Sequence, residues 1–413
     1  MTAPACPPGG CLVTSRTDVR GRRAMTLRIL HTADLHLERA FAQLGCYGEV
    51  ARRRRAGLRD ALVRAGDEAM RRNCSVLTLG GDLYEADQAG PDTARFLSDL
   101  FATWRPLRVV VAPGNHDPFM PGSLYARTEW PDNVHIFSEN ELRPLPLGGG
   151  VVLWGLAHRE PGWMGDPLAV AEVGGEGGVH IALFHGAELG SRPDGKSIHG
   201  PFRAADVGAR GFTLALCGHY HRRRIDSAAR IVYPGSPEPL TFDEDGERGP
   251  VVVEVGERGR VRVEALATNR WHALRADCEL DGVNSTTAVA ERVRTAVSAA
   301  VGRLPADTTM LRLTLRGEVP AEVAVDVNAV EMAATDATGA AVVRVRDLTT
   351  AAVDIAGVAS ERTARGLFAR EMIGAINAAG DDAAERALLE DALRYGLQAL
   401  DGTEVGLREG VAQ

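Results

Sequence analysis

The chain has 413 residues, of which 45% are hydrophobic and 25% charged, and its formal net charge is −8 at pH 7. This length suggests two or three domains, and the ordinary composition excludes a disordered, collagen-like or coiled-coil protein. Because the charge balance is acidic, overall electrostatics do not attract the chain to nucleic acid, and any phosphate-binding face must be local.

The sequence contains few localisation signals. No stretch approaches the roughly 18 consecutive apolar residues of a membrane span, and six cysteines without a CxxC pair favour a reduced, cytoplasmic setting. The first 24 residues contain no apolar run of the secretory type. Since Met25 directly precedes the first strand-like run, residues 1–24 are expected to be a disordered leader or a stretch upstream of the true start.

The first 250 residues alternate short apolar runs with helical patterns. Strands are expected at 28–32, 75–79, 108–112, 151–156, 180–184 and 213–217. Helices are expected between the first three of these, at about 50–72 and 92–104. Strands that alternate with helices imply βαβ units, so the sequence predicts a layered α/β domain over residues 25–266.

The pattern changes after residue 251. Residues 251–255 and 261–265 predict a closing hairpin, and residues 271–349 follow a strand–helix–strand–helix–strand pattern typical of a small α/β accessory domain. Residues 361–400 predict a C-terminal helical segment with an amphipathic face. That face fits either packing within its own domain or docking of a partner.

Polar residues that can bind metal follow most of the predicted strands. They are Asp34 and His36 in HTADLHL, Asp82 in GGD, Asn115 and His116 in GNHD, His185 in FHG, and His219 and His221 in GHYH. Since ligands bind at the carboxyl ends of strands in α/β sheets, the loops there can bring these residues into one crevice. Residues i and i+2 of an extended segment point to the same side, so the D-x-H and H-x-H spacings suit a shared site.

The kinds of side chain point to the metal and its chemistry. Carboxylate, amide and imidazole groups without a thiolate suit Mn, Fe or Zn better than Ca or Mg. The candidate ligands are too many for one ion and about right for two. A two-metal site stabilises both the attacking and the leaving oxygen of a phosphoryl displacement. The other six histidines lack such company and are interpreted as structural or surface residues.

The ordered set D-x-H, G-D, G-N-H-D, H and G-H-x-H resembles the calcineurin-like metallophosphoesterase superfamily over residues 28–242. HTADLHL, FHG, GHYH and YPGSPEPL resemble its DNA-repair exonuclease branch of the SbcD type, and PGNHDPFMPGS with WPDNVHIF resembles the YhaO-like bacterial exonucleases. The resemblance implies a β-sandwich flanked by helices and two divalent ions, Mn²⁺ first, with Fe or Zn as alternatives. It also implies a DNA exonuclease that acts in double-strand break repair.

The resemblance further implies a role for each position. One ion would be held by Asp34, His36 and His221, the other by Asn115, His185 and His219, with Asp82 as the bridge. His116 would be catalytic, because it would orient the scissile phosphate and protonate the leaving oxygen. Asp117 would hold that imidazole, and Ser236 would support the rim of the site. Several nucleases of this family carry an extra His or Asp shortly after the bridging Asp; here Glu85 is the nearest polar residue, which leaves the balance of exo- and endonuclease action open.

DNA binding is expected at the arginine run that directly follows H-x-H, namely Arg222, Arg223 and Arg224, with a solvated arginine face as the alternative. The resemblance implies an SMC-like ATPase with a long coiled coil as partner, and a homodimer. Two other functions remain open on the sequence. One is a phosphodiesterase that acts on nucleotides or other small phosphodiesters, and the other is a binding subunit whose chemistry is secondary.

Overall fold

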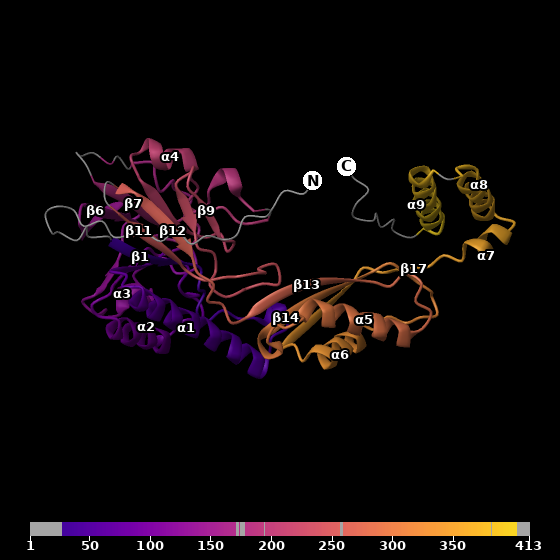
Figure 1. Ribbon diagram of the computed structural model, residues 1–413, viewed down its shortest axis with the longest axis horizontal. Helices are drawn as coiled ribbons and strands as arrows, with labels where there is room; N and C mark the ends of the chain where they lie inside the picture. Colours follow the sequence, from indigo (N-terminus) through magenta and orange to yellow (C-terminus); the bar gives the residue numbers. More distant parts are fainter. Residues whose placement is uncertain are drawn as a thin grey trace, which may run out of the picture. The chain divides into compact units, whose positions relative to one another are not determined.

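The computed structural model describes residues 27–170, 173, 178–193, 195–256, 259–380 and 382–402, and its elements are labelled in Figure 1. The expected leader, residues 1–24, lies outside the described residues. The chain divides into two compact units. The first contains the described residues up to Leu274 with 303–311 and 340–342, and the second contains 275–302, 312–339 and the described residues from 343 onward.

Two six-stranded sheets form the core of the first unit. One has the order β12-β11-β1-β2-β3-β4 and the other the order β5-β6-β7-β8-β10-β9. The strands of the first sheet are β1 (Leu27–Thr32), β2 (Val76–Leu79), β3 (Arg108–Val111), β4 (Val134–Ile136), β11 (Val251–Val255) and β12 (Val261–Ala265). Those of the second are β5 (Arg143–Gly148), β6 (Val151–Gly155), β7 (Val179–His185), β8 (Leu214–Gly218), β9 (Arg224–Asp226) and β10 (Ile231–Tyr233). Strands β1 to β4 run parallel, as do β6, β7 and β8.

Apolar side chains from both sheets meet in one buried cluster, so the sheets pack face to face as a sandwich. Ile29 and Val253 contribute from the first sheet, and Ile181 and Leu216 from the second. β-Branched and aliphatic residues dominate these strands, as expected of strands buried on both faces.

Helices cover the outer faces of the sandwich, with α1 and α2 on one side and α4 on the other (Figure 1). They are α1 (Gly48–Arg71), α2 (Pro91–Thr103), α3 (Leu124–Arg127) and α4 (Ala204–Ala209), with short 3₁₀ turns at Ala42–Leu44, Leu189–Ser191 and Ala306–Thr308. Leu58 and Leu62 of α1 pack in the same cluster as Leu77 of β2, whereas Val207 of α4 packs with the second sheet. The predicted α/β sandwich flanked by helices is therefore confirmed.

The second unit is built largely on a three-stranded sheet of order β13-β14-β16. Its elements are β13 (His272–Glu279), α5 (Thr286–Val301), β14 (Thr309–Arg316), β15 (Glu318–Val319), α6 (Val327–Thr338), β16 (Val342–Asp347), β17 (Thr350–Ala351), α7 (Ile355–Ser360), α8 (Ala364–Ala378) and α9 (Ala383–Leu400). The strand–helix–strand–helix–strand pattern predicted for residues 271–349 appears as β13, α5, β14, α6 and β16. Helices α8 and α9 share a small apolar cluster that includes Ala369 and Leu393. Within the described ranges, no helix combines the length and apolarity needed to cross a bilayer.

Candidate metal centre and active site

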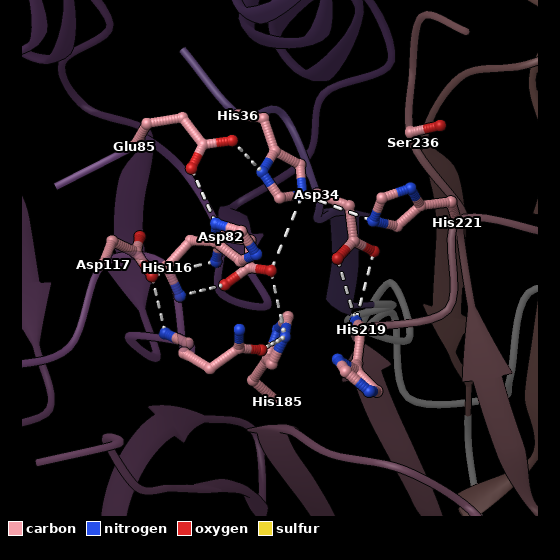
Figure 2. Close-up of polar contacts among 12 residues, drawn as sticks. Asp34, His36, Asp82, Glu85, His116, Asp117, His185, His219, His221 and Ser236 are labelled. Atoms are coloured by element: carbon pink, nitrogen blue, oxygen red, sulfur yellow. Dashed lines mark hydrogen bonds and ion pairs between the residues drawn. The ribbon is translucent and has the colours of Figure 1, made fainter. Parts of the chain in front are cut away.

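The predicted polar residues meet at one edge of the sandwich, where β1, β2, β3, β7 and β8 end. Asp34 and His36 follow β1, Asp82 follows β2, Asn115 and His116 follow β3, His185 ends β7, and His219 and His221 follow β8. Figure 2 shows the labelled members of this set gathered around one region, although they come from positions almost two hundred residues apart. The parallel strands of the two sheets thus place their C-terminal loops together.

The backbone of these loops is fixed in an uncommon conformation. Four candidate ligands have positive φ, namely Asp34 (55°), His36 (50°), Asp82 (53°) and His219 (108°). Such angles are costly for residues other than glycine and persist only where the surroundings impose them. The expectation of an extended D-x-H segment is therefore wrong, although Asp34 and His36 still reach the same site. The β1 loop is held by bonds from Asp34 N to Gly81 O (3.1 Å) and from His36 N to Asp82 O (2.9 Å).

Two neighbouring groups of side chains have the geometry of metal ligands. In the first, ligand atoms of Asp34, His36 and His221 all lie within 4.8 Å of one another, and in the second, those of Asp34, Asp82 and His185 do so. Asp82 lies between the histidines of the two groups, since its Oδ2 is 3.2 Å from Nε2 of His185 in the second group and 3.6 Å from Nε2 of His36 in the first. The arrangement suits two adjacent cations that share carboxylates.

The hydrogen bonds of the imidazoles direct one nitrogen of each toward the ligand groups, since His185 Nε2 lies 3.0 Å from Asn115 Oδ1 and His221 Nε2 lies 3.3 Å from His36 Nε2. A carbonyl oxygen can only accept, so His185 Nδ1 donates to Gly80 O (2.9 Å) and His219 Nε2 donates to Ser197 O (2.8 Å). The remaining nitrogen of His219, Nδ1, is buried and has no hydrogen-bond partner among the described residues. A buried nitrogen without a partner is costly unless something binds it. These residues therefore fit divalent metal ions.

The pKa values of Asp82 and its neighbours also favour the binding of cations at this site. Burial alone would raise the pKa of the Asp82 carboxyl, but the His185 and His36 imidazoles hold it well below its usual range. Burial would lower the pKa of His185, whereas the Asp82 carboxylate raises it to about 9. Burial and the nearby His185 lower the pKa of His219 to about 2, so its imidazole is neutral and can act as a ligand.

Glu85 holds two imidazoles of the site, a role that its sequence position alone did not reveal. Its Oε1 lies 2.9 Å from His36 Nδ1 and its Oε2 lies 2.6 Å from His116 Nδ1 (Figure 2). Both distances are those of charge-assisted hydrogen bonds. Burial lowers the pKa of His116, but the hydrogen bond to Glu85 together with the negative charges of Asp82 and Glu85 raises this pKa above its usual value. Glu85 therefore fixes the orientation of the predicted catalytic imidazole.

The substitution Glu85→Gln is expected to lower kcat about 10–100-fold, because partners that orient a functional imidazole commonly have effects of this size. The same change in a His116→Ala background should add little, since Glu85 would act through His116. Steady-state kinetics of both variants, with bound metal measured alongside, test this role. A full additional loss in the double variant would instead assign the effect to His36.

Asp117 and Ser236 lie next to the site, with contacts other than those predicted. The Asp117 carboxylate accepts bonds from the backbone N–H groups of Asp82 and Gly114 and from the Tyr125 hydroxyl, so it holds the loops, while Glu85 holds the imidazole of His116. Buried backbone donors need acceptors, which explains where this carboxylate points.

Ser236 is completely buried, not at a rim. Its hydroxyl donates to Glu244 Oε2 (2.5 Å), and Glu244 Oε1 accepts from His221 Nδ1 (2.9 Å). This leaves His221 Nε2 directed at the ligand group. No motif singles out Glu244, because it lies 23 positions from its histidine.

The arginines of the predicted DNA-binding run have different surroundings. Arg223 donates to two backbone carbonyl oxygens at 2.7 and 2.9 Å, and Arg224 forms ion pairs with two carboxylates at 2.8 and 3.1 Å. Arg222 is exposed. The structure thus leaves Arg222 as the member of the run whose charge faces solvent, and DNA binding by this run stays a prediction.

Comparison with known proteins shows which family the first unit resembles. Residues 27–223 match the family of calcineurin-like phosphoesterases, a segment that contains all of the candidate metal ligands. This segment is thus similar to the calcineurin-like metallophosphoesterase superfamily, whose members are metal-dependent phosphoester hydrolases.

Two relatives extend this similarity along the chain. The metallophosphoesterase YhaO of Bacillus subtilis (strain 168) is 27% identical over 307 residues, which cover 71% of this chain and 72% of that protein. The DNA double-strand break repair protein Mre11 of Methanopyrus kandleri is 26% identical over 298 residues, which cover 65% of this chain and 62% of that protein. This chain therefore spans less than two thirds of the archaeal protein.

Similar solved structures include TT1561 of Thermus thermophilus, with a TM-score of 0.34 and 14% identity over 58% of this chain and 99% of that one. A dimetal phosphatase from Danio rerio aligns with a TM-score of 0.33 and 13% identity, over 58% of this chain and 98% of that one.

Proposed function

We propose that this protein is a two-metal-dependent DNA exonuclease that acts in double-strand break repair. The observation that carries the hydrolytic part is the pair of ligand groups that share Asp34, with Asp82 between His185 and His36. Support for DNA as the substrate comes from the similarity to a protein named for double-strand break repair.

The residues of the site have separable tasks in this reaction. Two divalent ions, Mn²⁺ or alternatively Fe or Zn, would supply the positive charge and the acidified water that phosphoryl transfer needs. The two ligand groups described above would hold these ions. His116, whose side chain is 40% exposed, faces solvent at the site and is placed to meet a substrate. With its Nδ1 bound to Glu85, its Nε2 is the atom that would give a proton to the leaving oxygen.

Degradation assays with defined substrates test this proposal. End-labelled linear duplex DNA and cyclic and linear mononucleotides are incubated with the protein and Mn²⁺, and EDTA serves as the metal-free control. We expect progressive loss of the labelled DNA end, which also reports polarity. Turnover confined to the mononucleotides would contradict DNA as the substrate and favour a small-molecule phosphodiesterase.

The substitution Arg222→Ala tests the local DNA contact. If Arg222 neutralises one phosphate, its removal should reduce the slope of log affinity against log salt concentration by about 0.9. Binding of fluorescent duplex DNA, measured across a salt series, gives the slope. Arg262→Ala, which removes an exposed arginine on the edge strand β12, is the matched control and should leave the slope unchanged. An unaltered slope in the Arg222 variant would remove this residue from the interface.

We also propose an SMC-like ATPase with a coiled coil as a partner, bound through α8 and α9. Large apolar side chains remain exposed there, with Leu367 54% and Leu388 64% accessible. Replacing both leucines by arginine should abolish co-purification of the ATPase with this protein. Nuclease activity on short DNA should persist. If the double variant still bound the ATPase, the binding surface for this partner would lie outside the exposed face of α8 and α9.

A further inference from the structure

Lys196 is the single lysine of a chain that has 47 lysine and arginine residues, and its side chain reaches the candidate metal centre. Its Nζ lies 3.1 Å from Nε2 of His221. The residue belongs to the long connection between β7 and α4 and is half-buried. None of the roles derived above uses this ammonium group.

The backbone that follows Lys196 is held by hydrogen bonds. Ser197 O accepts the bond from His219 Nε2 at 2.8 Å, and His199 O accepts one from Ala187 N at 2.8 Å. The contact that orients His219 is therefore made by the residue directly after Lys196. This places the ammonium group beside His221 as a built feature of the site.

The surroundings of Lys196 differ from those of the other cations near the site. Arg39 lies 3.4 Å from the Glu85 carboxylate, and Arg248 lies 3.6 Å from that of Glu244. Within the part of the chain that the structure describes, no carboxylate lies within ion-pair distance of Lys196. The Lys196 ammonium group instead contacts Nε2 of His221. A metal ion bound by His221 would need the lone pair of this same nitrogen.

Metal binding would therefore change the position of Lys196. An ion held by His221 takes away the lone pair that the ammonium group contacts, and two cations side by side repel each other. The ammonium group would then need an anion as its partner, and a phosphate attracted by the charge of the two ions would supply oxygens in this part of the site. Lysine suits this task as a compact point charge with three donors, and it is a common phosphate ligand.

We propose that Lys196 binds a phosphate oxygen of the substrate on the His219–His221 side of the site. This inference rests on the proposed phosphoesterase function and adds a substrate-contacting residue to it. The ligand chemistry is a phosphate or phosphodiester oxygen, whichever molecule carries it.

Phosphate binding by the metal-loaded protein tests this inference. Inorganic phosphate is titrated by calorimetry into the Mn²⁺-loaded wild type and into the variants Lys196→Ala and Lys196→Arg. Arg192→Ala, an exposed cation of the same connection, is the matched control. Kinetics with bis(p-nitrophenyl) phosphate and the bound Mn²⁺ content are measured in parallel.

We expect Lys196→Ala to weaken phosphate binding by about 10–100-fold, the effect of losing a hydrogen bond to a charged group. KM should rise similarly, and Lys196→Arg should recover part of the loss. The Mn²⁺ content should remain at the wild-type level or Mn²⁺ should bind more tightly, because a repelling charge is gone. The Arg192 variant should match the wild type.

Two results would overturn the inference. Unchanged phosphate affinity with tighter Mn²⁺ binding would mean that Lys196 only occupies the position of an ion in the metal-free protein. A reduced Mn²⁺ content would mean that it positions His221. A failure of the proposed function gives a different result. If phosphate binding depends on Lys196 but no phosphodiester is hydrolysed, the inference about Lys196 stands and the proposed nuclease function is contradicted.

Discussion

The substitution His116→Ala is expected to lower kcat on duplex DNA by about 10²–10⁴-fold while bound metal stays at the wild-type level. General acid catalysis by a positioned side chain typically contributes this much. The imidazole is well placed for that role, since it is partly exposed and its Nδ1 is held by Glu85 at 2.6 Å. Single-turnover kinetics and metal analysis of the same protein sample test both parts.

A histidine outside the site provides the control for His116. His135 lies on β4 and packs edge-on against Phe137, so His135→Ala removes the same side chain away from the ligand groups. It should leave kcat unchanged. If the His116 variant lost its metal, His116 would be a ligand and the proton would have to come from elsewhere.

The sequence predicted the convergence of the site because each polar cluster directly follows a strand-like run. Asp34, Asp82 and His185 lie at strand ends that parallel pairing brings to one edge, and this rule needs no knowledge of the loops. The same rule did not predict the positive φ of Asp34 and Asp82, because loop conformation depends on the bonds between loops.

Residues that act on the ligands from longer loops could not be identified from the sequence. Glu244 and Lys196 both contact His221 but lie 23 and 25 positions away from it, in connections without regular structure. A run of arginines in the sequence likewise does not reveal which of them form hydrogen bonds or ion pairs within the protein. Arg223 binds backbone carbonyl groups and Arg224 enters the short edge strand β9, and both outcomes depend on tertiary packing.

The substitution Asp82→Asn is expected to reduce activity by at least about 10³-fold and to lower the bound metal. The Asp82 side chain is almost completely buried, and its Oδ2 faces nitrogens of both His185 and His36. An amide has nearly the same shape and keeps an acceptor for the His116 N–H, but it lacks the negative charge. Losing several kcal/mol of charge stabilisation corresponds to a rate loss of this order. Metal content and steady-state activity give the two readouts.

Comparison with Asp34→Asn separates the two carboxylates. Both oxygens of Asp34 accept from the His219 backbone N–H, at 2.9 and 3.2 Å, whereas Oδ2 of Asp82 lies between two ligand histidines. We therefore expect the larger loss of metal at Asp82. Asp132→Asn, which changes an exposed carboxylate paired with Arg105, is the neutral control. A larger loss at Asp34 would transfer the bridging role to that residue, because it is the one that belongs to both ligand groups.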